Sequence, residues 1–314
     1  MVIPTRCATN LPLTPSLVRR GSWWRRLPLL RGGYRGVILA VVSLLIPSVP
    51  ALAAGAAQVT ITRVSALPSL PGDAAWRAVA AARVPLIPQD LVEPRQLTPT
   101  TPEVLVRAAT DGSRVAFLLE WTDATADDMT KPAQFTDACA VQLPIDVAAD
   151  LPAPQMGEPG RRVEITYWRA VWQAAVDGRP DSIRALYPGA SVDHYPFEAA
   201  PLRDEPKARQ EMETRYAPAR ALGNEMAGPR QRPVEDLVAE GPGTLSPAAK
   251  QESSGSGMRT ATGWAVMLVR PLPPALSAGK RTQAAFAVWD GARGEVGARK
   301  MRSVWVPIAT EAKR

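Results

Sequence analysis

The stretch 104–121, VLVRAATDGSRVAFLLEW, decides the fold class. Two runs rich in Val, Leu, Ala and Phe flank Asp111-Gly112, a dipeptide that favours the tight turn of a β-hairpin. Similar short runs, separated by Pro, Gly and Asp, recur along the chain. The expected strands cover residues 59–64, 104–108, 114–121, 138–143, 163–172, 264–270, 284–289 and 302–308. Strands of this length and spacing predict a mainly β protein, an antiparallel β-sandwich with a few short helices.

The region 196–258 differs from the rest because it is polar and charged. We expect it to be a loop and helix insertion within a single domain, residues 57–310, since its apolar content is too low to form a core of its own. Its pattern predicts a helix at 207–215, a second short helix near 234–239, and a mobile loop tip at 253–257.

The first 53 residues carry seven arginines and no acidic residue. An apolar run at 37–46 follows the arginines, and small residues lie at Ala51 to Ala53. This order is typical of a signal peptide, residues 1–53, that is cleaved near Ala53 after export by the general secretory route. The apolar run is shorter than the roughly twenty residues of a membrane span, and an uncleaved N-terminal anchor is the competing interpretation.

The charge balance depends on this segment. The whole chain has 37 basic and 30 acidic residues and a formal net charge of +7. Removal of the seven arginines leaves 30 basic residues against 30 acidic ones, so the mature part is about neutral. The basic excess belongs to the signal peptide, and we therefore expect no nucleic-acid partner.

Cysteine and histidine usage excludes several cofactor sites. Cys7 lies in the signal peptide, so Cys139 is alone in the mature part and is expected to be a buried strand residue. The sequence has no Cys-x-x-Cys-His motif, which excludes covalent attachment of a c-type haem. His194 is the only histidine, so sites that need two or three imidazoles are excluded as well.

Motifs of common enzyme classes are missing or incomplete. Gly241-Pro242-Gly243 lacks the third glycine of a dinucleotide-binding fingerprint, and no Gly-x-Ser-x-Gly elbow occurs. The acidic pairs Asp127-Asp128 and Asp204-Glu205 are typical of solvated surfaces. We expect no catalytic residue in this chain.

Met156 is the most informative single residue. It lies in the loop Pro154-Gln155-Met156-Gly157-Glu158, between a proline and a glycine, where little helix or strand is available for packing. Its thioether therefore suits presentation to a metal. The alternative is an adaptable side chain that fills a gap under the loop.

Several segments, read in order, resemble one known family. They are FTDACAVQLP (135–144), MG (156–157), YWRAVWQ (167–173), YAPARALGN (216–224), VEDLVAEGPGTL (234–245), FAVWDGA (286–292), GARK (297–300) and SVW (303–305). Together they resemble the haem b (gamma) subunits of type II molybdenum enzymes of the dimethyl sulfoxide reductase family. That group includes the gamma subunits of ethylbenzene dehydrogenase, dimethyl sulfide dehydrogenase, chlorate reductase and selenate reductase.

The resemblance implies a periplasmic β-sandwich that holds one non-covalent haem b through a methionine and a lysine. By position in the quoted segments, these ligands are Met156 and Lys300. Lysine is uncommon here, with 6 lysines among the 30 basic residues of the mature part, and the alternative role for Lys300 is to guard an exposed strand edge. The aromatic residues expected to line the haem slot are Trp168, Trp289, Trp172 and Phe286.

The resemblance also implies electron transfer and no catalysis. An iron with two protein ligands has no open position for a substrate, so the subunit is expected to relay single electrons. The implied partners are a molybdenum catalytic subunit, an iron-sulfur subunit and a soluble c-type cytochrome, with no stable membrane span after signal removal. The alternatives are an exported sandwich that binds carbohydrate or a protein partner without haem, and a free-standing haem carrier.

Overall fold

The computed structural model describes residues 57–129, 131–146, 150–180, 186–190, 204–216, 218–222, 230–277 and 279–311. The expected signal peptide and His194 lie outside these residues. Within them the chain is mainly β, as expected from the sequence.

The strands of the described part lie at β1 (Val59–Arg63), β2 (Ala81–Pro85), β3 (Ile87–Pro88), β4 (Glu103–Thr110), β5 (Arg114–Thr122), β6 (Ala138–Pro144), β7 (Val163–Arg169), β8 (Val234–Ala239), β9 (Ser246–Pro247), β10 (Ser254–Arg259), β11 (Gly263–Pro271), β12 (Thr282–Trp289), β13 (Met301–Arg302) and β14 (Val306–Thr310). The helices are α1 (Ala170–Val176), α4 (Pro206–Tyr216), α5 (Pro218–Ala221) and α6 (Pro274–Ser277). Two 3-10 turns lie at η1 (Ala74–Ala78) and η3 (Gly291–Arg293).

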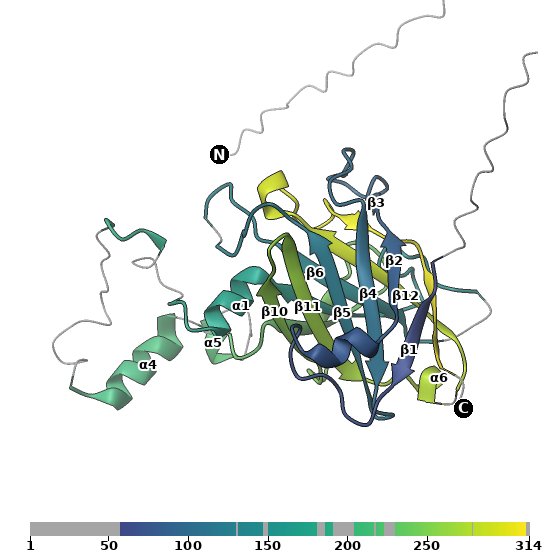
Figure 1. Ribbon diagram of the computed structural model, residues 1–314. Helices are drawn as coiled ribbons and strands as arrows, with labels where there is room; N and C mark the ends of the chain where they lie inside the picture. Colours follow the sequence, from purple (N-terminus) through teal and green to yellow (C-terminus); the bar gives the residue numbers. More distant parts are fainter. Residues whose placement is uncertain are drawn as a thin grey trace, which may run out of the picture. The chain divides into compact units, whose positions relative to one another are not determined.

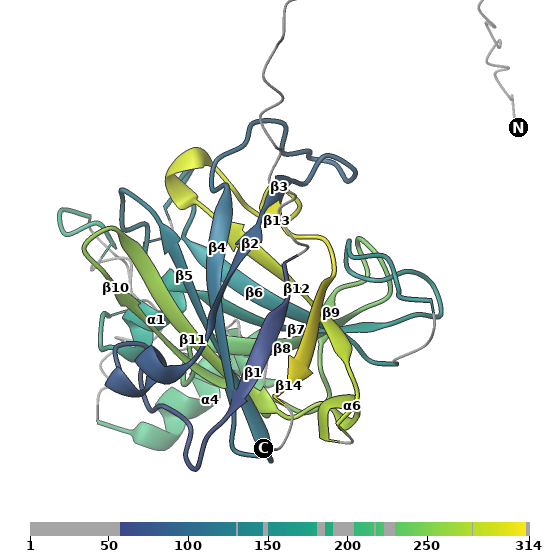
Figure 2. The same cartoon turned by 45° about the vertical axis from the view of Figure 1, so that its right-hand side comes forward.

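The strands form two layers that share strand β12. The hydrogen-bonded order is β10-β11-β5-β4-β1-β14-β12-β6-β7-β8-β9. The first part of β12, Thr282–Ala284, pairs with β14, and its second part, Ala285–Trp289, pairs with β6. Figures 1 and 2 show the layer of β10, β11, β5, β4 and β1 in front of the layer of β6, β7 and β8. The pairings are antiparallel, as predicted, except that β1 runs parallel to β4 and β14.

Alternating side chains fill the space between the two layers. Phe117 of β5 and Phe286 of β12 meet edge to face, with ring centroids 6.3 Å apart. Trp168 of β7 is fully buried and packs against Trp121 and Trp264. Cys139 lies in the same core, which confirms the expected buried strand position.

The predicted hairpin is confirmed. Strands β4 and β5 pair from Leu105 opposite Glu120 to Thr110 opposite Val115. Gly112 has a φ of 98°, a conformation that favours glycine, and the Asp111 carboxylate accepts hydrogen bonds from the backbone N–H groups of Ser113 and Arg114.

Four local predictions are wrong. Residues 234–239, expected to be helical, form strand β8, which pairs with β7 over Val163–Trp168. The expected loop tip at 253–257 is mostly strand β10, which pairs with β11. Both strands pair with neighbouring strands of the sandwich, which supply their hydrogen bonds. By contrast, the helix expected at 207–215 is confirmed as α4.

The other two corrections concern the bounds of predicted strands. The strand expected over 163–172 ends at Arg169, and helix α1 begins at Ala170, whose N–H donates to the carbonyl of Asp137. The strand expected over 302–308 is divided into β13 and β14. The regular strand pairing is interrupted at Ser303. Its N–H donates to the carbonyl of Phe286, and its hydroxyl donates to the carbonyl of Val304.

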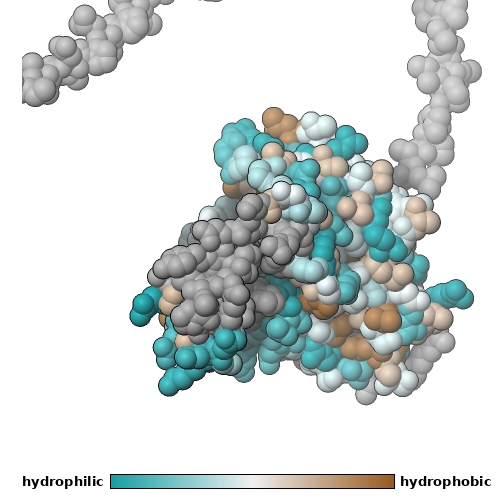
Figure 3. Space-filling view, turned by 90° about the vertical axis from the view of Figure 1, so that its left-hand side faces the viewer, coloured by the Kyte–Doolittle hydropathy of each residue, from teal (hydrophilic) through white to brown (hydrophobic). Residues whose placement is uncertain are grey.

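Among the described residues, no helix is long and apolar enough to cross a bilayer. Figure 3 shows one face of the molecule, where hydrophilic residues cover much of the described surface and hydrophobic ones gather in its lower part.

Substitution of Gly257 tests the packing of the inter-sheet core. A Cβ atom there would lie far inside van der Waals contact of the Trp168 ring, whose indole N–H is held by Gln173 at 3.2 Å. Gly257→Ala should therefore lower the free energy of unfolding by about 1–3 kcal/mol, measured by urea denaturation. Gly189→Ala, at a position facing open space, is the control and should have little effect. Equal stability of the two variants would contradict this packing.

Candidate functional site

A cavity of about 360 Å³ lies on the face of strands β6, β7, β8 and β12 that is opposite to the inter-sheet core. The alternation of side chains along each strand produces this separation. In β12, Phe286 and Val288 join the core between the layers, while Ala287 and Trp289 lie on the cavity side. The strand residues that line the cavity are Ala140, Gln142, Ile165, Tyr167, Leu237, Ala285, Phe286, Ala287 and Trp289.

Small side chains make room for the cavity. Ala140, Ala285 and Ala287 line it, whereas their strand neighbours Cys139 and Val288 are fully buried in the core. The sequence carries this signal as alternate alanines in 138–140 and 285–287, next to bulkier residues. Sequence reasoning missed it because alanine on a strand face is equally typical of close packing.

Loops form the walls of the cavity. The wall residues are Val92, Glu93, Pro154, Gln155, Met156, Pro242, Gly243, Leu245, Gly297, Ala298, Lys300, Arg302 and Ser303. The lining is largely apolar, and its charged members are Glu93, Lys300 and Arg302. Such a cavity suits a large apolar ligand with a few polar groups.

Met156 is held in the wall by its backbone. Its φ is 70°, in the left-handed region that a bulky side chain rarely adopts. The N–H of Gly241 donates to the Met156 carbonyl at 2.8 Å, and the N–H of Gly157 donates to the carbonyl of Ala153 at 2.9 Å. The amide of Gln142 adds a bond to the carbonyl of Pro154 at 3.1 Å. Strained backbone that its surroundings hold in place is typical of functional positions.

Lys300 lies on the wall formed by the turn before β13. It is 9% exposed, and its Nζ lies 4.8 Å from the centroid of the Trp289 ring. Its carbonyl accepts a hydrogen bond from the N–H of Gln89 at 3.0 Å, which anchors the turn to the segment after β3. Burial, with a smaller contribution from the charge of Arg302, lowers the pKa of Lys300 to about 8. The neutral amine, the form that can bind a metal, is thus far easier to reach by deprotonation than in a solvated lysine.

Aromatic rings complete one side of the cavity. The indole N–H of Trp289 donates to the carbonyl of Gly297 at 3.1 Å, so this ring is fixed to the same turn that carries Lys300. Tyr167 meets Trp289 edge to face at 5.2 Å and Trp172 at 5.5 Å. Burial raises the pKa of Tyr167 to about 12, so its phenol stays neutral.

The structure brings together most of the residues singled out from the sequence. Met156, Lys300 and Trp289 line one cavity. Phe286 also borders it, but its ring packs against Phe117 in the core between the layers. Trp168 is not part of its lining, because it points into the inter-sheet core, one strand position away from Tyr167. Trp172 lies in α1 and packs behind Tyr167 without lining the cavity. Tyr167 is the aromatic lining residue of β7 that the sequence did not identify.

Residues 73–301 match the family model described as ethylbenzene dehydrogenase. The chain belongs to this family. The matched range contains both Met156 and Lys300, and it confirms the family relationship expected from the quoted segments.

Two curated relatives support this placement. A protein of Haloferax mediterranei named as a respiratory nitrate reductase heme subunit is 32% identical over 126 residues, which are 40% of this chain and 43% of the relative. The chlorate reductase subunit gamma of Ideonella dechloratans is 25% identical over 206 residues, 63% of this chain and 60% of the relative. The matches thus span less than two thirds of the length of either relative.

Among solved structures, a carbohydrate binding module of family 9 from Caldicellulosiruptor kristjanssonii, in complex with cellotriose, shows a distant likeness. Its TM-score is 0.41 at 9% identity, over 82% of this chain and 95% of the module. A likeness this distant says nothing about the ligand of the present cavity.

The buried amine of Lys300 makes the stability of the haem-free chain depend on pH. Because its folded pKa is about 8 and its usual value is 10.5, the unfolded chain binds more protons between these pH values, and the stability attributable to this group rises with pH across that window. Lys300→Met should therefore exceed the wild type in free energy of unfolding at pH 7 by up to about 3 kcal/mol. Urea denaturation should show this advantage shrinking towards pH 10.5. An advantage that is independent of pH would contradict the assigned burial.

Proposed function

We propose that this member of the ethylbenzene dehydrogenase family is an exported electron-transfer subunit that holds one haem b, whose iron would be bound by the side chains of Met156 and Lys300. One observation carries the proposal. A thioether and an amine of lowered pKa, far apart in the sequence, line the same apolar cavity. The names of the two relatives, a heme subunit and a gamma subunit of reductases, support the same function.

The chemistry of the cavity fits a haem. Apolar walls suit the macrocycle, and the lining offers one soft sulfur donor and one nitrogen donor. When bound, a haem supplies a one-electron couple at its iron. Burial of Lys300 favours the neutral amine, so part of the cost of deprotonation is met by the fold before a metal binds.

The other lining residues position the ligand. The alanines of β6 and β12 leave room for a flat ring system, and Trp289 and Tyr167 present rings beside it. Arg302 is 6% exposed and lines the same wall as Lys300. We assign its guanidinium to the carboxylates of the haem, because arginine pairs well with carboxylates.

The position of both ligands in walls built from loops on a rigid sheet suits electron transfer. Hydrogen bonds on either side of Met156 and at the Lys300 carbonyl hold both donor residues in place, so they would hold a bound haem with little movement of the protein. We infer a periplasmic protein that relays electrons between an iron-sulfur subunit, itself docked to a molybdenum catalytic subunit, and a soluble c-type cytochrome. The arginine-rich segment 1–53 supports export.

The ligand assignment predicts the absorption spectrum. The full chain, expressed with ample haem, should show a low-spin b-type spectrum with one haem per chain. Met156→Ala and Lys300→Ala should each convert it to a high-spin or haem-depleted form, because each removes one axial donor. Met258→Ala and Lys280→Ala are matched controls, since both side chains are exposed, and they should keep the wild-type spectrum.

An unchanged low-spin spectrum in Met156→Ala or Lys300→Ala would refute the assignment of that residue as an iron ligand. Absence of a Soret band in the wild type would refute the whole proposal and favour a haem-free binding module.

A second test concerns the place of binding. Ala140→Leu fills space in the cavity and leaves both proposed ligands unsubstituted, and it should weaken haem binding by at least about tenfold while the chain stays folded. Ala81→Leu, on an exposed position of β2, is the control. Haem titration monitored by absorbance measures both. Wild-type affinity in Ala140→Leu would place the haem elsewhere.

A further inference from the structure

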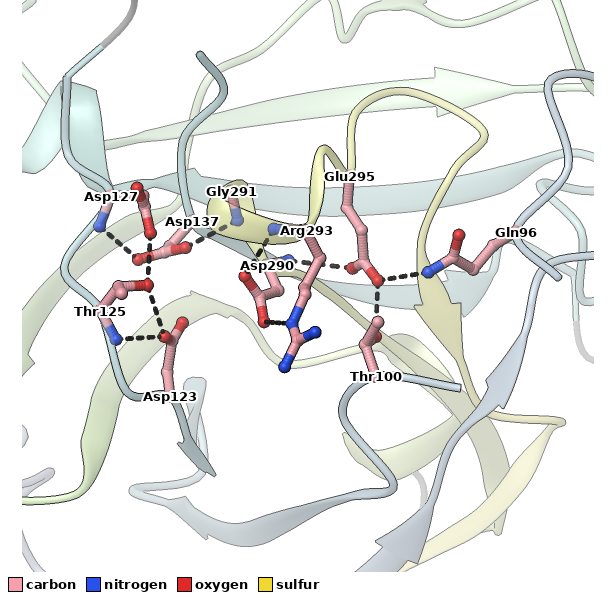
Figure 4. Close-up of polar contacts among 10 residues, drawn as sticks. All are labelled: Gln96, Thr100, Asp123, Thr125, Asp127, Asp137, Asp290, Gly291, Arg293 and Glu295. Carbon is pink, nitrogen blue, oxygen red and sulfur yellow. Dashed lines mark hydrogen bonds and ion pairs between the residues drawn. The ribbon is translucent and has the colours of Figure 1, made fainter. Parts of the chain in front are cut away.

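Four aspartates meet at one end of the sandwich, outside the cavity. They are Asp123 directly after β5, Asp127 in the following loop, Asp137 directly before β6, and Asp290 directly after β12. One carboxylate oxygen from each lies within 4.8 Å of the others (Figure 4). Asp127, expected from its acidic pair to lie on a solvated surface, is half-buried because segments from distant parts of the sequence surround it.

Asp123 supplies an independent sign of a ligand. This residue is 6% exposed, and its Oδ2 atom is buried without a hydrogen-bond partner. Its other oxygen, Oδ1, accepts from the N–H of Thr125 at 3.0 Å. A buried carboxylate oxygen that no donor satisfies is costly unless a cation occupies the space beside it. Figure 4 shows that Asp123 points towards the other carboxylates.

The surrounding cations do not balance the four carboxylates. Within the described residues, the one ion pair to this cluster joins Arg293 to Asp290 at 3.9 Å, and the Arg293 side chain is 69% exposed. Arg259 donates to the backbone carbonyl of Asp123 at 3.0 Å, not to its carboxylate. Solvent screens an exposed pair of this kind, so Arg293 offsets little of the repulsion among the four carboxylates.

Asp137 is held by neutral donors. Its Oδ1 accepts from the N–H of Gly291 at 2.9 Å, and its Oδ2 accepts from the N–H of Asp127 at 2.8 Å and from the indole N–H of Trp264 at 2.9 Å. These bonds fix the carboxylate in a fully buried position. The turn at Gly291 lies so close to Asp127 that a Cβ atom added at Gly291 would be only 2.7 Å from the Asp127 Cβ, so no larger residue fits there.

We propose that Asp123, Asp127, Asp137 and Asp290 bind one calcium ion. A donor set of carboxylate oxygens selects a hard cation. Calcium is favoured over magnesium because it accepts many oxygen ligands in irregular geometry, whereas magnesium keeps most of its water and uses few carboxylates. The charge of the ion offsets the repulsion within the cluster and satisfies the orphaned oxygen of Asp123.

The ion would brace the turn that leads to Lys300. Asp290 follows Trp289 of the cavity wall, and its N–H donates to Oε2 of the buried Glu295 at 2.9 Å. The other oxygen of Glu295 accepts from Gln96 at 2.6 Å and Thr100 at 2.5 Å (Figure 4). The site thus ties the end of β12 to the loops after β3 and β5.

The test uses the full chain after treatment with a chelator, with calcium chloride as the probe. Isothermal titration calorimetry should detect one calcium ion per chain, and calcium should raise the unfolding temperature. Asp123→Asn and Asp290→Asn should each weaken calcium binding by at least about tenfold. Asp128→Asn is the matched control, because it removes a carboxylate of the same loop that pairs with Arg179 and lies outside the cluster, and it should bind calcium like the wild type.

Absence of calcium binding by the wild type at millimolar concentration would overturn the proposal, and so would wild-type affinity in both Asp123→Asn and Asp290→Asn. Since Asp290 is only partly buried, its variant keeps the test open if Asp123→Asn fails to fold. The measurement is made with and without haem, so a chain that binds calcium but no haem would refute the proposed function alone.

Discussion

The structure depends on strand β12, which hydrogen-bonds to both layers of the sandwich. Its first residues pair with β14 and its last ones with β6, so one strand joins the two sheets. Because side chains alternate along a strand, Phe286 and Val288 fill the core while Ala287 and Trp289 face the cavity. Any shift of its register by one residue would exchange these two faces and destroy core and cavity together.

The main electrostatic feature of the cavity is a lysine that burial makes easy to deprotonate. A solvated amine would be almost entirely charged at neutral pH, and a charged group is a poor occupant of an apolar wall. The fold lowers the pKa of Lys300 by excluding water, and it keeps the strained Met156 in place through backbone hydrogen bonds. Burial of the Lys300 amine and the positive φ of Met156 are both unfavourable, and the stability of the rest of the sandwich offsets them, as is usual at a functional site.

The turn after β12 connects two parts of the molecule that are otherwise separate. Trp289 lies in the cavity wall, and Asp290, the next residue, lies among the acidic side chains at the end of the sandwich. Two hydrogen bonds fix the segment between Asp290 and Lys300. The Asp290 N–H donates to the Glu295 carboxylate, and the Trp289 indole N–H donates to the carbonyl of Gly297. Few residues therefore separate the wall of the cavity from the carboxylate cluster.

The sequence by itself determined the mainly β class, the hairpin at Asp111-Gly112 and most strand positions, because alternation and turn residues act locally. Through the resemblance, the sequence also singled out Met156 and Lys300, which line the same cavity. Only the tertiary structure decided that Tyr167, and not its neighbour Trp168, faces the cavity, and that 234–239 is a strand. The pattern of one strand does not say which of its faces meets the other layer. Likewise, the four aspartates come together only through folding, since their distance in space depends on how β5, β6 and β12 are aligned.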